Sequence, residues 1–232
     1  QRVGIEQLLG QAAHLAGEQF HQHVGDRRMA RLEVGERVAA QHQCFDRTDG
    51  DRAGGAAGVR VDQALLAVRV LGTNLKGSAL AFAHGLEWCL ANGITIANLS
   101  LSTSNINAAA TFHELVDAAT FGRTMLVSAM SNERKRTIPS EYAGVFSVAC
   151  GPGSDREQLW CNPQGPAEWA ACGVDVDVAW TGGASIRATG NSFAAPVIAG
   201  HLARIAGAHP GITPWQARTV LAALAINAPA GG

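Results

Sequence analysis

The sequence has few charges, few aromatic side chains and no long apolar run. Only 16% of its 232 residues are charged and 6% are aromatic, while 47% are hydrophobic. The formal net charge is -1, which gives no electrostatic case for binding nucleic acid or an anionic membrane. No apolar stretch reaches the length that crosses a bilayer. We therefore expect no nucleic-acid partner, no membrane segment and a substantial buried core.

Cysteine pairs of the kind that bind zinc are also missing. The five cysteines form no Cys-x-x-Cys pair and are odd in number, so neither a zinc site nor a full disulfide framework follows. We expect no metal and no cofactor.

The chain opens at Gln1 rather than Met, without a basic-then-apolar signal pattern, and we expect a fragment or a processed form. The missing signal therefore carries no conclusion about the compartment.

Regular hydrophobic patterning is missing from the first part of the chain. Residues 1–58 are rich in Gln, His, Arg and Gly, and their apolar residues are scattered. Apolar spacing is compatible with a helix over residues 7–20 and with a short strand or helix over 31–38, whereas 46–58 reads as a loop. We therefore predict an unassigned segment over residues 1–58, disordered or rearranged, and a core domain over 59–232.

From residue 59 onward, short apolar runs alternate with helical patterns. Strands are predicted at residues 65–71, 94–101, 124–129, 145–150 and 175–180, the first of them as a buried parallel strand. Helices are predicted at 79–92, 108–121, 192–208 and 214–225, with Ser78 and Thr213 as N-caps of the first and the last. The alternation predicts an α/β fold of three layers, a parallel sheet with helices on both faces. In such sheets, sites form just after the strands, at their carboxyl ends.

A serine at a loop-to-helix junction is the first candidate for chemistry. Gly190 and Asn191 precede Ser192, small and apolar residues follow it, and Pro196 comes four positions later. The pattern places Ser192 at the start of a buried helix, where exposed backbone N–H groups can stabilise a developing negative charge. Serine is also a preferred N-cap residue, so the same pattern fits a serine that only caps a helix.

The segment around Ser192 resembles the Gly-Thr-Ser-x-Ala-x-Pro segment at the nucleophile of the subtilisin-like serine peptidases. Further segments resemble that family in the same order, namely residues 66–72, 77–78, 85–93, 98–102, 127–133 and 171–175, the last with Cys172 in place of a proline. Several weak motifs in one order are more specific than any one of them alone. The resemblance covers about residue 59 to the C-terminus and implies a subtilisin-like fold and a serine endopeptidase lineage.

The resemblance also implies roles for particular residues. Ser192 would be the nucleophile and Asn132 the oxyanion-hole donor, because a side-chain amide offers N–H groups without a charge. An asparagine after a strand can equally be a plain turn residue. An extended peptide substrate would pair by its main chain with segments 76–78 and 100–102. The substrate-binding residues implied in this way are Gly77, Ser78, Ser100, Leu101, Ser102, Ala129 and Met130.

The first specificity pocket would lie between segments 100–102 and 128–131. Met130 and Ser131 stand there in place of smaller family residues, which predicts a preference for small substrate side chains. Efficient cleavage after large aromatic residues would contradict that preference.

The histidine and aspartate motifs of the family are absent from this sequence. A serine nucleophile needs a base, and the base needs an orienting carboxylate. In the family both precede the strand predicted at 65–71, in His-Gly-Thr and Asp-Ser-Gly or Asp-Thr-Gly settings, and neither setting occurs here. His42 is nearest to the expected place, with Asp26 as its candidate partner. His201 would lie roughly 13 Å from Ser192 along one helix, too far for a hydrogen bond.

Two explanations account for the missing motifs. Either residues 1–58 replace the first strands of the family through truncation, rearrangement or translation in an unintended frame, or the protein is a degenerate relative. Both predict a sheet that lacks the first strands of the family and a chain that is weakly active or inactive. Two alternatives to a serine endopeptidase remain. One is a pseudo-peptidase that keeps the peptide-binding groove, and the other is a chain in which no function survives. The family often acts outside the cell.

Overall fold

The computed structural model describes residues 34–35, 66–72, 76–133, 135–162, 164–179 and 184–228. All of them belong to one of the two units into which the chain divides, Leu32–Gly232. The other unit, Gln1–Arg31, lies outside the described residues. The helix expected at 7–20, the loop expected at 46–58 and the candidates Asp26 and His42 also lie outside them.

A five-stranded sheet with the order β3-β4-β5-β7-β6 forms the centre of this unit. β3 (Ile96–Leu99), β4 (Met125–Ala129), β5 (Val145–Cys150) and β7 (Trp169–Ala171) are parallel, and β6 (Leu159–Cys161) is antiparallel to β7. The three longest of these strands confirm the predictions at 94–101, 124–129 and 145–150. Because β3 and β4 are parallel, with Leu99 beside Ser128, their carboxyl ends meet at one edge of the sheet.

The four predicted helices all form, each within two residues of the expected bounds. They are α2 (Ala79–Ala91), α3 (Ala109–Phe121), α4 (Asn191–Ala208) and α5 (Pro214–Ala223), and a short 3-10 turn, η1 (Ile106–Ala108), precedes α3. The Ser78 hydroxyl accepts the N–H of Ala81 at the start of α2, as predicted. Thr213 and Gln216 form a capping box at the start of α5, which satisfies two backbone donors that a helix end leaves open.

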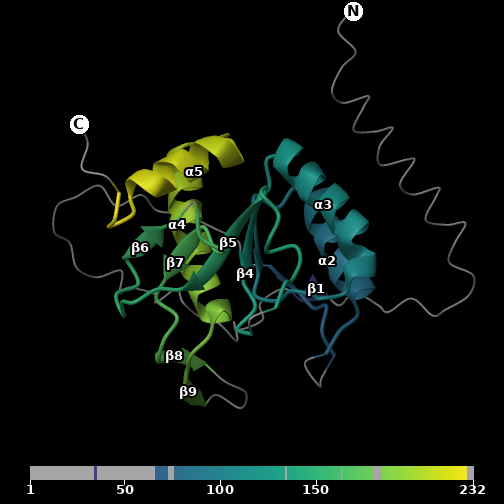
Figure 1. The fold of residues 1–232 in the computed structure, drawn as a ribbon. Coiled ribbons are helices and arrows are strands. Elements are labelled where there is room, and N and C mark those ends of the chain that lie inside the picture. Colours follow the sequence, from purple (N-terminus) through teal and green to yellow (C-terminus); the bar gives the residue numbers. More distant parts are fainter. Residues whose placement is uncertain are drawn as a thin grey trace, which may run out of the picture. The chain divides into compact units, whose positions relative to one another are not determined.

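The helices cover both faces of the sheet and create a three-layer arrangement. On one face, Val127 and Phe146 pack with Ile198 and Leu202 of α4 and with Leu221 of α5. On the other face, the neighbouring strand residues Leu126 and Val145 pack against α2 and α3. Figure 1 shows these two helix pairs on opposite sides of β4 and β5. Each large side chain buried in these cores contributes roughly 1.5–3 kcal/mol to folding.

The prediction of a buried parallel strand at residues 65–71 is wrong. Of the described residues in this range, only Ala67–Val68 form a strand, β2, which pairs antiparallel with β1 (Val34–Gly35) in a separate two-stranded sheet. The apolar run instead packs on α2, because Val70 lies so close to Gly85 that a side chain there would collide with it. Apolar character alone does not distinguish a strand inside a sheet from an extended segment lying on a helix.

The strand predicted at 175–180 forms as β8 (Val176–Ala179), but not in the parallel sheet. It pairs antiparallel with β9 (Ser185–Ala188) as a separate two-stranded ribbon. Asp175, in the left-handed region at φ 51°, precedes β8, and its N–H donates to the Thr189 hydroxyl just after β9. The ribbon therefore leads directly into Gly190 and α4.

Candidate functional site

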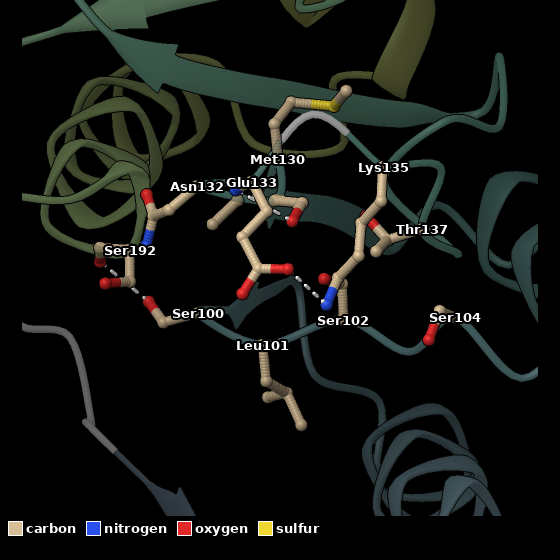
Figure 2. Close-up of a pocket in the computed structure, with 12 residues that line it drawn as sticks. Ser100, Leu101, Ser102, Ser104, Met130, Asn132, Glu133, Lys135, Thr137 and Ser192 are labelled. Atoms are coloured by element: carbon tan, nitrogen blue, oxygen red, sulfur yellow. Dashed lines mark hydrogen bonds and ion pairs between the residues drawn. The ribbon is translucent and has the colours of Figure 1, made fainter.

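The carboxyl ends of β3 and β4 and the start of α4 enclose a pocket of about 310 Å³. Figure 2 shows Ser192 at one end of it, with Asn132 and Ser100 beside it. Seven of the residues predicted for the site line this pocket, namely Ser100, Leu101, Ser102, Ala129, Met130, Asn132 and Ser192. A hydrogen bond here joins Ser100 to Ser192, which lies 92 positions later in the chain.

Gly77 and Ser78 are not among the residues that line the pocket. Ser78 uses its hydroxyl as the N-cap of α2. Gly77 packs against the preceding segment, where an added Cβ would lie 2.6 Å from the carbonyl oxygen of Val70. The structure thus brings one predicted substrate-binding segment to the pocket and gives the other a role in the packing around α2.

Ser192 lies in the first turn of α4 and is not its N-cap. The N-cap is Gly190, in extended conformation with φ 166° and ψ 152°, and no side chain caps the helix there. The first backbone N–H groups of a helix have no partner within the helix. The N–H of Asn191 donates to the Asn132 side chain, whereas the next N–H, that of Ser192 itself, remains available to a ligand.

Gly190 lies between the hydroxyl of Ser192 and the side-chain amide of Asn132. A Cβ at position 190 would be 3.5 Å from Ser192 Oγ and 3.4 Å from Asn132 Nδ2. These two groups are therefore neighbours on one side of the glycine. Both distances are ordinary van der Waals contacts, so a Cβ at position 190 would touch the two groups without displacing them.

The orientation of the Asn132 amide is fixed by a backbone donor. The N–H of Asn191 donates to Asn132 Oδ1 at 2.9 Å. Because a backbone N–H can only donate, the oxygen of the amide must occupy this position. Nδ2, the other end of the amide, is then left as a donor near Ser192 Oγ. An oxyanion that forms next to the Ser192 hydroxyl can accept hydrogen bonds from two nearby N–H donors, Asn132 Nδ2 and the Ser192 N–H.

The far part of the pocket contains an ion pair. Glu133 Oε2 and Lys135 Nζ are 2.8 Å apart, and Figure 2 shows the two side chains pointing toward each other across the pocket. The hydrogen bond from Lys135 and its charge lower the pKa of the Glu133 carboxyl, so this group is ionised at neutral pH. The pair and the hydroxyls of Ser104, Ser131 and Thr137 give this part of the pocket a polar lining. No sequence pattern around Glu133 and Lys135 predicts this ion pair.

No histidine of the described part of the chain lines the pocket. His201 is buried, and its Nε2 lies 3.3 Å from the carbonyl oxygen of Arg156. His113 is exposed on α3, with Nδ1 3.5 Å from Asp117. His42 and its candidate partner Asp26 lie outside the described residues. Within the described ranges, the polar side chains beside Ser192 are therefore the Ser100 hydroxyl and the Asn132 amide.

Other kinds of site are not found among the described residues. No group of three or more His, Cys, Asp or Glu side chains is arranged there to hold a metal ion. The same residues include no helix that is long and apolar enough to span a membrane.

Relatives of the chain include bacterial proteases. It is 31% identical over 166 residues to the thermostable alkaline protease of Halalkalibacterium halodurans, a match that covers 71% of this chain and 45% of that protein. It is 31% identical over 169 residues to Subtilisin Savinase of Lederbergia lenta, covering 72% of this chain and 62% of that protein. The chain thus spans about half the length of the curated relatives it matches.

The fold is shared with a solved structure, that of a cold-adapted subtilisin-like serine proteinase. The TM-score is 0.56 at 21% identity, over 69% of this chain and 61% of that one, and the shared feature is the three-layer fold. A sequence model of the subtilase family matches residues 37–230. This match extends over most of the chain, and it includes β3, β4 and α4, the elements that carry the pocket. The chain belongs to the subtilase family.

Proposed function

We propose that the chain carries the acyl-transfer half of a serine endopeptidase site. Ser192 Oγ attacks the carbonyl carbon of a peptide bond and gives up its proton to a base. The carbonyl oxygen becomes an oxyanion, held by Asn132 Nδ2 and the Ser192 N–H. As this intermediate collapses, the base returns the proton to the leaving amine, and an acyl-enzyme remains for water to hydrolyse. The observation that carries the proposal is the fixed Asn132 amide, with its nitrogen beside the Ser192 hydroxyl across Gly190.

The substrate is an extended peptide that pairs with the segment after β3. Leu101 and Ser102 line the pocket just beyond the carboxyl end of that strand, where main-chain groups can bind a further strand. The specificity pocket lies between this segment and residues 129–131. Met130 and Ser131 support a preference for small side chains, and Glu133 and Lys135 add two further side chains to the lining of the pocket.

Turnover by this chain is weak in our proposal. The sequence contains no His-Gly-Thr motif, and no described histidine lines the pocket. Members of a catalytic triad act as a unit, so a serine that lacks its base keeps only residual catalysis from the oxyanion hole and from binding. A base supplied by His42 would raise the activity.

A second function is favoured by the absence of a histidine from the described lining of the pocket. A pocket with a strand-binding edge and no base among the described residues beside its serine fits a peptide-binding pseudo-peptidase. In that case extended peptides bind along Leu101 and Ser102 through main-chain hydrogen bonds and are released intact.

Labelling of the serine distinguishes the two functions. The chain is treated with a fluorophosphonate, which reacts only with an activated serine, and the labelled residue is identified by mass spectrometry. Covalent modification of Ser192, absent in Ser192→Ala, supports the peptidase. Binding of an extended peptide to the wild-type chain without labelling supports the pseudo-peptidase. Neither labelling nor peptide binding, in a chain that unfolds cooperatively, would refute both.

A further inference from the structure

Asn191 makes four hydrogen bonds to residues around the pocket. Its N–H donates to Asn132 Oδ1 at 2.9 Å. Its side-chain oxygen accepts the N–H of Cys150, the last residue of β5, at 2.9 Å. Its side-chain nitrogen donates to the carbonyl oxygens of Met130 and Ser131, both at 3.2 Å. One residue thus ties the start of α4 to the ends of two neighbouring strands.

These four hydrogen bonds leave Asn191 with no donor for a substrate. The oxygen of its amide holds a backbone N–H, and the nitrogen is shared between two carbonyl groups. The only other donor of the residue, its backbone N–H, is directed to Asn132. Any effect of Asn191 on chemistry at Ser192 must therefore pass through the groups that it holds.

We infer that Asn191 is a positioning residue, which holds the Asn132 amide with its nitrogen directed to the oxyanion and locks the loop that carries it. The backbone N–H selects the orientation of the amide, because the opposite orientation would place the NH₂ group against another donor. The side chain fixes Met130 and Ser131, the two residues directly before Asn132. This inference rests on the proposed function for its catalytic consequence, but the orientation itself can be measured without any activity.

The two parts of the role can be separated by two substitutions at one position. Asn191→Ala removes the side-chain bonds and keeps the backbone N–H, whereas Asn191→Pro removes both. Position 191 is the first residue of α4, where proline fits a helix best. The preceding Gly190 is extended, as a residue before proline prefers to be. The difference between the two variants therefore reports the N–H bond to Asn132 while the helix is retained.

The first readout is the side-chain amide signal of Asn132 in ¹H–¹⁵N spectra of the full chain, assigned through Asn132→Asp. We expect this signal to change strongly in Asn191→Pro and to change less in Asn191→Ala. An unchanged Asn132 signal in a folded Asn191→Pro variant would overturn the inference. So would equal changes in the two variants, because a merely structural residue would act through its side chain alone.

The second readout is the rate at which a fluorophosphonate labels Ser192. We expect a loss of at least about tenfold in Asn191→Pro, with the roughly 100- to 1,000-fold cost of losing a whole oxyanion donor as the upper limit. In an Asn132→Ala background, Asn191→Pro should lower the labelling rate little further. If the losses in labelling rate from the two substitutions are additive, Asn191 does not act through Asn132. If the wild-type chain is not labelled at all, the proposed peptidase function fails, while the amide signal still decides the role of Asn191.

Discussion

The hydroxyl of Ser100 donates to the backbone carbonyl oxygen of Ser192 at 3.0 Å. In a regular helix that carbonyl would accept the N–H of the residue four positions later, but here this residue is Pro196, which has no N–H. Asn98 Nδ2 in turn donates to Ser100 Oγ at 3.0 Å, which directs the Ser100 hydrogen toward the carbonyl. The end of β3 thus supplies the donor that the proline removes from the first turn of α4.

We predict that Ser100→Ala destabilises the chain by about 1 kcal/mol, because it leaves a partly buried carbonyl without its donor. Pro196→Ala restores an N–H four positions after Ser192, so the cost of Ser100→Ala should be smaller in that background. Urea unfolding of the two single variants and the double variant measures the coupling. Ser104→Ala, at an exposed serine of the same pocket, is the matched control. Equal costs of Ser100→Ala with and without Pro196 would contradict the explanation.

Asn132 offers a test of the oxyanion donor that leaves its structural bond in place. Asn132→Asp keeps the oxygen that accepts the N–H of Asn191 and loses the NH₂ group, whereas Asn132→Ala loses both. We expect both variants to label with a fluorophosphonate roughly 100- to 1,000-fold more slowly than wild type. Only Asn132→Ala should also lower the midpoint of thermal unfolding. A wild-type labelling rate in Asn132→Asp would show that the amide nitrogen is not the donor.

Much of the fold could be predicted because its elements carry their own local signals. α2 and α5 have polar N-caps at Ser78 and Thr213, and β4 is a run of five buried residues after a turn. Short elements have no such signal. β6 and β7 have three residues each, too few to show a period, and they exist because they pair with each other and with β5.

Site residues were predicted only where a short segment carries a pattern. Ser192 and Asn132 were proposed from segments that resemble one family in the same order, and both line the pocket. The roles of Ser100 and Asn191 depend on partners 41 to 92 positions away, which no local pattern reveals. One signal was nevertheless present in the sequence: a proline four residues after Ser192 means that the Ser192 carbonyl needs a donor from elsewhere. The sequence could not name Ser100 as that donor, since this requires the packing of α4 against β3.

The Glu133–Lys135 pair leads to a prediction about specificity. We expect Glu133→Ala to enlarge the pocket and to raise the ratio of cleavage after Phe to cleavage after Ala in otherwise identical peptides. Glu133→Gln keeps the size of the side chain and should leave this ratio nearly unchanged. Competition between the two peptides for one chain, followed by mass spectrometry, gives the ratio directly. Efficient cleavage after Phe by the wild-type chain would contradict the preference for small residues.

His201 allows a pH prediction that is independent of the pocket. Burial lowers the pKa of this histidine below 6.5, its ordinary value, and the nearby Arg204 lowers it further, against the opposing effects of the Arg156 carbonyl and Glu157. In the unfolded chain the ring takes up a proton as the pH falls through about 6.5, whereas in the folded chain it stays neutral until its lower pKa is reached. The unfolded state therefore binds more protons in this window, and the free energy of unfolding should decrease as the pH falls from about 7.5 to 5.5.

His201→Gln isolates that contribution. Glutamine can donate to the Arg156 carbonyl as the neutral ring does but does not titrate, so its unfolding free energy should depend less on pH than that of the wild type. Urea unfolding of both proteins at pH 5.5 and 7.5 measures the difference, and identical pH dependences would contradict the prediction.

The same variant tests whether His201 is the base that activates Ser192. Because His201 contacts Arg156 and does not line the pocket, His201→Gln should label with a fluorophosphonate at the wild-type rate. Complete loss of labelling in a folded His201→Gln chain would instead identify this histidine as the partner of Ser192.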